Sequence, residues 1–177
     1  MDLSQTVWAL ALIFTLCAGW VDWRTRQIPN WLTVSGFLAG IAANSILGGW
    51  QGVKISLEGA GLALGLLLPL VLLRGLGAGD WKLMGAIGAV TGWRAMLSIL
   101  VVSILMSGVM AMIQMALTKR MKTTLRNMLV VAKGLVTFGL RANPEISLDN
   151  PTLIKLPFGS AVAVATVFCF VRVHWKL

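Results

Sequence analysis

Residues 95–118 read AMLSILVVSILMSGVMAMIQMALT, which is 24 residues without a charged side chain. A helix needs roughly 20 apolar residues to cross the hydrocarbon core of a bilayer, so this run is long enough to span a membrane. Further charge-free runs occupy residues 3–21, 27–53, 59–73 and 156–171. Apolar and polar residues do not alternate within them, as they would in the strands of a transmembrane barrel. The sequence therefore predicts an all-α membrane protein.

The composition points to the same class of protein. Of the 177 residues, 58% are hydrophobic and only 12% are charged, whereas an ordinary soluble domain is about 25% charged. These figures exclude a disordered chain, a disulfide-stapled secreted miniprotein and almost any soluble globular domain. Cys17 and Cys169 each lie alone in an apolar run, without the spacing of metal ligands. We expect one membrane-embedded domain over residues 1–177, with neither metal nor cofactor.

We expect six transmembrane helices and therefore both ends of the chain on one side of the membrane. Besides the five charge-free runs, we expect a further segment at residues 83–92, which is the fourth in chain order. It is glycine-rich and short, so neighbouring helices must shield it. One side then carries the basic residues Arg24, Arg26, Arg74, Lys82, Lys119, Arg120, Lys122, Arg126, Lys133, Arg141 and Lys155, and the other carries Lys54, Arg94, Arg172 and Lys176. Eleven against four places the first side in the cytoplasm and both termini outside.

Other features fit this topology. Seven of the eight tryptophans fall near predicted helix ends, where aromatic side chains meet the lipid headgroups. The basic loop at residues 119–155 is predicted to be cytoplasmic, with an amphipathic helix at 125–140 that lies on the inner leaflet. Its basic residues either attract anionic lipid or only set the topology. Because topology explains the excess of basic residues, we expect no nucleic-acid partner.

Glycine spacing predicts tight packing between helices. Gly36 and Gly40 are four residues apart, as are Gly61 and Gly65, and Gly85, Gly88 and Gly92 continue the pattern. Small residues at this spacing let helices approach closely.

Two of the six carboxylates occupy unusual positions. Asp22 ends the first predicted span and Asp80 precedes the fourth, and the two crossings between them return the chain to the same membrane face. Acidic residues at a membrane boundary indicate function. Two neighbouring carboxyl groups cannot both ionise easily, so one takes a proton from water while the other, protonated, polarises a carbonyl. This is aspartic-protease chemistry; the alternative is that each aspartate caps a helix or pairs with a basic neighbour.

The residues around the two aspartates strengthen the catalytic interpretation. Pro29 fixes the chain where it enters the second helix, at which an early proline is tolerated. Gly77 and Gly79 allow unusual backbone dihedrals and close approach of a substrate strand before Asp80. Lys82 favours ionisation of Asp80, contacts the substrate or extends its amine to the membrane surface, and the sequence does not choose among these roles.

At this point the sequence resembles the type IV prepilin peptidases over roughly residues 8–170. The matching residues are Asp22 followed by Ile28-Pro29-Asn30, then Gly77-x-Gly79-Asp80-x-Lys82-Leu83, then Pro157-Phe158-Gly159. Ser160 departs from the pattern, because many members have a second proline there. The resemblance implies that Asp22 and Asp80 are catalytic, supported by Pro29, Asn30, Gly77, Gly79, Lys82, Pro157, Phe158 and Gly159. It also implies a prepilin or pseudopilin substrate, cut at the cytoplasmic face of the bacterial inner membrane.

The chain is similar to the compact members associated with Flp or Tad-type pili. It has neither the length nor the cysteine pairs of members that also methylate their product, so we expect no methyltransferase activity. Three alternatives stay open. The first is a presenilin-like protease, although the chain has no tyrosine and no Pro-Ala-Leu. The second is a small proton or ion transporter subunit that uses the two aspartates, and the third is a noncatalytic assembly subunit.

Overall fold

The protein is described here by a computed structural model of residues 3–73, 75–118 and 157–175. These residues form four helices, α1 (Leu3–Thr25), α2 (Asn30–Leu72), α3 (Ala78–Thr118) and α5 (Phe158–Trp175). Regular structure in the described ranges is helical, which confirms the all-α prediction for them. The basic loop at 119–155, with its predicted amphipathic helix, lies outside the described residues.

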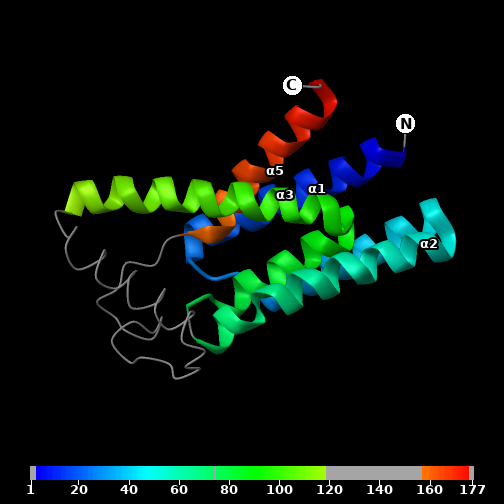
Figure 1. Cartoon of the computed structure of the whole chain (residues 1–177), viewed down its shortest axis with the longest axis horizontal. Helices are drawn as coiled ribbons and strands as arrows, with labels where there is room; N and C mark the ends of the chain where they lie inside the picture. Colours follow the sequence, from blue (N-terminus) through cyan, green and yellow to red (C-terminus); the bar gives the residue numbers. More distant parts are fainter. Residues whose placement is uncertain (1–2, 74, 119–156, 176–177) are drawn as a thin grey trace.

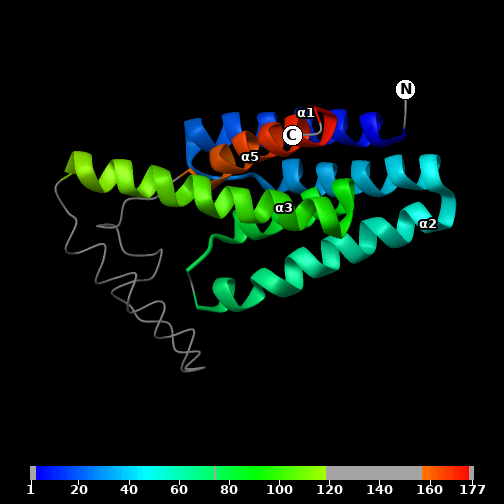
Figure 2. The ribbon, with the colours of Figure 1, turned by 45° about the horizontal axis from the view of Figure 1, so that its top comes forward.

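Helices α2 and α3 each turn back on themselves at a glycine. With 43 residues, a straight α2 would be about 65 Å long, twice the thickness of a bilayer core. Gly49 interrupts α2 with φ 55° and ψ −138°, and Gly92 interrupts α3 with φ 74° and ψ 171°. Such φ values strain residues that carry a Cβ. Each helix therefore consists of two arms that lie alongside one another (Figure 2). The arms of α2 are residues 30–48 and 50–72, and those of α3 are residues 78–91 and 93–118.

The outside of the bundle is apolar. Leu38, Ile104 and Phe168 are each more than half exposed, and contiguous apolar surface of this kind suits lipid rather than water. By length and composition, α1, α2 and α3 could each cross a membrane, and α5 is a shorter apolar helix. The chain is thus a multi-pass membrane protein, as its composition predicts.

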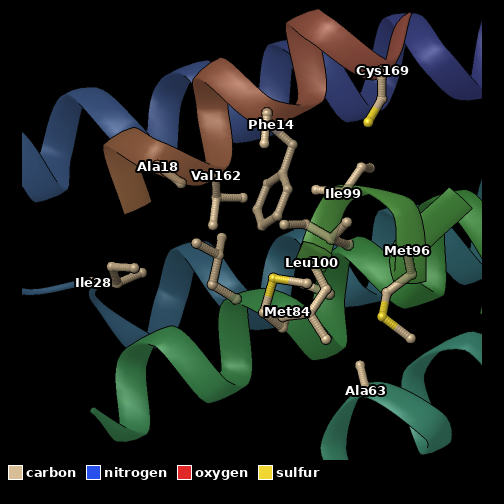
Figure 3. Close-up of a cluster of buried hydrophobic side chains, with 14 of the residues drawn as sticks. Phe14, Ala18, Ile28, Ala63, Met84, Met96, Ile99, Leu100, Val162 and Cys169 are labelled. Carbon is tan, nitrogen blue, oxygen red and sulfur yellow. The ribbon is translucent and has the colours of Figure 1, made fainter. Parts of the chain in front are cut away.

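The helices pack in a simple order. Helix α5 lies between α1 and α3, and α2 packs chiefly against α3 (Figure 1). Their buried side chains meet in one core, where Phe14 of α1 and Val162 of α5 lie close to Met84 and Leu100 of α3 (Figure 3). Ile28, from the short connection between α1 and α2, joins the same core.

Glycines bring the arms of α2 and α3 into close contact. A Cβ on Gly88 would overlap the Gly59 carbonyl group, and one on Gly40 would lie 2.8 Å from the backbone nitrogen of Val90. Gly85 receives the side chain of Leu64 in the same way. Tight packing is therefore confirmed for these positions.

The prediction is wrong for Gly61 and Gly65. A Cβ at either position would have no neighbour within 4 Å. The second arm of α2 turns Gly59, Ala63 and Leu67 toward the core. Residues 61 and 65 fall on the opposite side of the helix, since each residue adds about 100° of rotation. Glycine spacing alone does not reveal which side of a helix is buried.

A polar cluster lies near the two kinks. The Asn44 side-chain nitrogen donates to Ser56 Oγ at 2.9 Å and to the carbonyl oxygens of Ala89 and Val90 at 3.0 Å each. These contacts join both arms of α2 to the first arm of α3. Ser56 is fully buried, so the cluster satisfies polar groups that would otherwise lack partners in an apolar interior.

Exposed tryptophans mark both ends of the bundle. Trp20, Trp23 and Trp31 lie around the connection between α1 and α2, and Trp50 and Trp93 directly follow the kink glycines. For these five residues the predicted position near the ends of apolar helical stretches is confirmed.

Candidate active site

Asp22 is positioned by the end of α1. It lies in the last turn, and its side chain is only 4% exposed. The helix ends three residues later, where Arg26 adopts a left-handed φ of 52° and its N–H donates to the Asp22 carbonyl oxygen at 2.8 Å. This is a C-cap that glycine forms more often than arginine. The cap stops α1 directly beyond Asp22.

The first motif continues into α2 through Pro29. With φ −70° and ψ 144°, Pro29 is the N-cap of α2 and precedes its first turn. Its carbonyl oxygen accepts the N–H of Leu32 at 3.1 Å. Ile28 is buried in the core (Figure 3). The proline and the buried isoleucine together fix where the chain enters α2.

Asp80 lies in the first turn of α3 and is half-buried. A Cβ on Gly77 would lie 3.1 Å from Asp80 Oδ2, and one on Gly79 would lie 3.3 Å from the Ile28 Cβ. The unusual dihedrals expected at these glycines do not occur, because among the described glycines only Gly49 and Gly92 have positive φ. Gly77 and Gly79 instead provide space beside the carboxyl group and beside the first motif.

Two side-chain hydrogen bonds attach the second motif to α2. Lys82 Nζ donates to Asn30 Oδ1 at 2.9 Å, so it links the first turn of α3 to the first turn of α2. Trp81 Nε1 donates to the Leu64 carbonyl oxygen at 2.8 Å in the second arm of α2. Within the described part of the chain, Lys82 forms no hydrogen bond or ion pair with Asp80. Lys82 instead contacts Asn30, a residue of the first motif.

The third motif reaches Asp22 from the start of α5. The Gly159 N–H donates to Asp22 Oδ2 at 2.7 Å in a buried contact. A Cβ on Gly159 would lie 2.9 Å from the Asp22 Cβ, so this approach requires glycine. Pro157 is buried before the helix and accepts a 2.7 Å hydrogen bond from the Ser160 hydroxyl, while Phe158 packs against the core.

Three distant parts of the sequence thus meet at one end of the bundle. The carboxyl groups of Asp22 and Asp80 lie within electrostatic reach of each other. Two neighbouring carboxyl groups from separate helices, one buried and the other half-buried, can share one proton and act as an acid and a base. The described residues contain no group of three or more His, Cys, Asp or Glu side chains that could hold a metal ion.

A family model described as the type IV leader peptidase family matches residues 9–112. The chain belongs to this family. Family A24 peptidases are aspartic peptidases, and membership implies cleavage of prepilin leader peptides. Comparisons with curated proteins and with solved structures gave no match.

The residues that match the family model include Asp22 and Asp80 but not Gly159. The contact of Gly159 with Asp22 comes from the structure, as do the Arg26 cap and the interaction of Asp22 with the backbone of Ser160. Sequence reasoning missed the Arg26 cap, because glycine is the more usual residue at a left-handed C-cap. It missed the backbone role of Ser160, because every residue has a backbone and its identity gives no signal. Only the family resemblance draws attention to Gly159.

Proposed function

We propose that this leader peptidase is a membrane aspartic endopeptidase in which Asp22 and Asp80 form the catalytic pair. It removes the basic leader from a prepilin or pseudopilin. The observation that carries the proposal is the convergence of these two carboxyl groups, 58 positions apart in the chain, at one end of the bundle. The family match supports the class of substrate.

The proposed topology has six spans, with the catalytic end and the loop at 119–155 in the cytoplasm. The kinks at Gly49 and Gly92 support this count, since they divide the described helices into six stretches. In Figure 1 the first residues of α1 and the last residues of α5 both lie away from the connection that follows Asp22. The excess of basic residues on the catalytic side supports its placement in the cytoplasm of a bacterium.

The proposed substrate lies partly in the membrane. Its apolar helix stays in the bilayer beside the enzyme, and its leader lies at the inner surface, so the scissile bond reaches the depth of Asp22 and Asp80. Holding the bond there supplies proximity, which can lower a barrier by several kcal/mol. Lys82 and Asn30, hydrogen-bonded to each other at 2.9 Å, support the site by keeping the two aspartate motifs together. Pro29 and Pro157 fix the chain where α2 and α5 begin.

We further propose that the enzyme is a peptidase only, of the compact kind found with Flp or Tad-type pili. The sequence has two cysteines, one in α1 and one in α5, and no cysteine pair in the loop at 119–155. Incubation of the pure protein with S-adenosylmethionine and cleaved pilin should give no methylated product. Methyl transfer would show that this part of the proposal is wrong.

Co-expression with a candidate prepilin tests the proposed function. The wild-type enzyme should reduce the prepilin mass by that of its leader, whereas Asp22→Asn and Asp80→Asn should not. Glu58→Gln is the matched control, because it makes the same acid-to-amide change at an exposed position in the second arm of α2. Leader removal by either aspartate variant at the control rate would exclude that residue from the catalytic pair.

A further inference from the structure

The two aspartates of the proposed pair have unequal surroundings. Asp22 is 4% exposed, and its Oδ2 accepts the Gly159 N–H at 2.7 Å. Asp80 is only half-buried, and no described residue donates a hydrogen bond to its carboxyl group. A carboxyl group that accepts backbone N–H donors is stabilised in its ionised form. The difference in hydrogen-bond donors therefore affects which of the two carboxyl groups is protonated.

The donor to Asp22 belongs to the start of a helix. Gly159 is the second residue of α5, which has 18 residues, so its N–H has no partner within the helix. The first turn of a helix also carries partial positive charge. A separation of 2.7 Å is typical of hydrogen bonds in which one partner is charged. Burial of Asp22 disfavours its charge and is the largest single influence on it, whereas the backbone of Ser160 and the charge of Arg26 add to the Gly159 hydrogen bond in favouring a negative Asp22.

The aspartates' own helices act in the opposite direction. Asp22 lies at the carboxyl end of α1, where a negative charge is disfavoured, and Asp80 lies in the first turn of α3, where it is favoured. These dipoles act without direct contact, however. Asp22 has a donor at 2.7 Å, and hydrogen bonds to charged groups are among the stronger polar interactions in proteins.

We propose that the contact at the start of α5 gives the two aspartates different catalytic roles: Asp22 is the ionised general base, and Asp80 is the protonated general acid. The proposal rests on the proposed function of the pair and goes beyond it by assigning the two roles. It also gives Gly159 a role as a positioning residue, which acts through Asp22 and does not touch the substrate.

The assignment gives a balanced reaction. Asp22 takes a proton from water, the water oxygen bonds to the scissile carbonyl carbon, and Asp80 gives its proton to the carbonyl oxygen. The product is a neutral gem-diol. Asp22 then gives its proton to the leaving nitrogen as the C–N bond breaks, and Asp80 takes a diol proton as the carbonyl re-forms. The pair returns to its starting state, with a new carboxyl group and a new amine.

The scarcity of acids makes the protonation states measurable. The chain has only four aspartates, Asp2, Asp22, Asp80 and Asp149, so aspartate labelled with carbon-13 at the side-chain carboxyl gives four signals. Asp22→Asn and Asp80→Asn identify two of them in the full-length protein. As the pH of the wild-type protein is raised, the Asp22 signal should become that of a carboxylate before the Asp80 signal does. The reverse order, or simultaneous ionisation, would overturn the proposal.

A matched pair of variants tests the role of α5. Gly159→Ala places a Cβ 3.0 Å from Asp22 Oδ2 and should push the carboxyl group off its donor. Gly85→Ala strains a helix contact to a similar degree, since its Cβ would lie 2.8 Å from Leu64 Cδ2, but this contact joins α3 to α2 and does not involve Asp22 or the start of α5. Ionisation of Asp22 should move to higher pH in Gly159→Ala and stay in place in Gly85→Ala. Equal shifts in both variants, or none in either, would overturn the role of Gly159.

The charged groups near Asp22 define what else could affect its titration. Asp80 of α3 and Arg26, which directly follows α1, interact with it. Other ionisable side chains on the described helices are Arg24 on α1, Lys54 and Glu58 on α2, Lys82 and Arg94 on α3, Cys169, Arg172 and His174 on α5, and Cys17 on α1. The titration is independent of turnover. If no prepilin is cleaved but Asp22 still ionises first, the proposed function fails while the charge assignment holds.

Discussion

The two ends of the helical bundle both place polar side chains inside an apolar protein, but they use them differently. At the kinked end, the Asn44 amide meets three acceptors, and the cluster around it joins three helical arms. At the other end, Asp22 accepts backbone N–H groups while Asp80 has no hydrogen-bond donor among the described residues. Buried polar groups with all partners stabilise a fold, whereas a carboxyl group lacking them is costly to keep and free to react.

The largest expected effects come from variants that change the catalytic carboxyl groups without weakening the fold. Replacing Asp22 or Asp80 by Asn should reduce the rate of leader cleavage by about 10²–10⁴-fold, because acid–base catalysis is lost. Thermal stability in detergent should stay constant or rise for Asp22→Asn, since an amide costs less to bury than a charge, and should stay constant for Asp80→Asn, which replaces a neutral acid by a neutral amide. A clear fall in melting temperature for both variants would show that the carboxyl pair also holds the fold together.

Contacts between glycines near the kinked end give the next prediction. Gly59→Ala should destabilise the protein by about 1–3 kcal/mol, because its Cβ would overlap the backbone of Gly88. Gly61→Ala, two residues further along the same arm, should change stability by less than about 0.5 kcal/mol, because it has no neighbour within 4 Å. Chemical unfolding in mixed micelles measures both. Equal effects would show that this arm packs through a different side.

Asn44→Ala tests the polar cluster itself. Ser56 and two backbone carbonyl groups would lose a donor, which should lower the free energy of unfolding by about 1–3 kcal/mol. The pH profile of leader cleavage should not move, because the change lies at the end away from Asp22. Ser45→Ala, at the neighbouring half-buried position, is the control and should change stability less. A shifted pH profile would show that the two ends are coupled.

The smallest expected effect concerns the hydrogen bond between Lys82 and Asn30. Lys82→Met should slow leader cleavage by roughly 2–10-fold, since the bond is exposed and contributes on the order of 1 kcal/mol. Lys82→Arg should restore part of the rate by donating again to Asn30, with kcat affected more than KM if the pair positions the aspartates. A loss of cleavage rate as large as that of Asp80→Asn would indicate that Lys82 acts directly in catalysis.

The sequence predicts much of this arrangement, because the apolar runs and the number of membrane crossings between two residues can both be read directly from it. Counting crossings is enough to bring Asp22 and Asp80 to one membrane face. It cannot show which side of a helix is buried, and the prediction of packing at Gly61 and Gly65 is wrong for this reason. It also cannot predict that the Gly159 N–H donates to Asp22, because a glycine permits a close approach without showing which side chain makes it.

The contact between Gly159 and Asp22 also has a consequence for biosynthesis. Asp22 belongs to α1, the first of the described helices, and its donor lies 137 positions later, in the last of them. Since chains fold from the N-terminal part as they are made, both aspartates are in the membrane well before α5. A chain that lacks α5 would therefore carry the two carboxyl groups without the contact that makes them unequal.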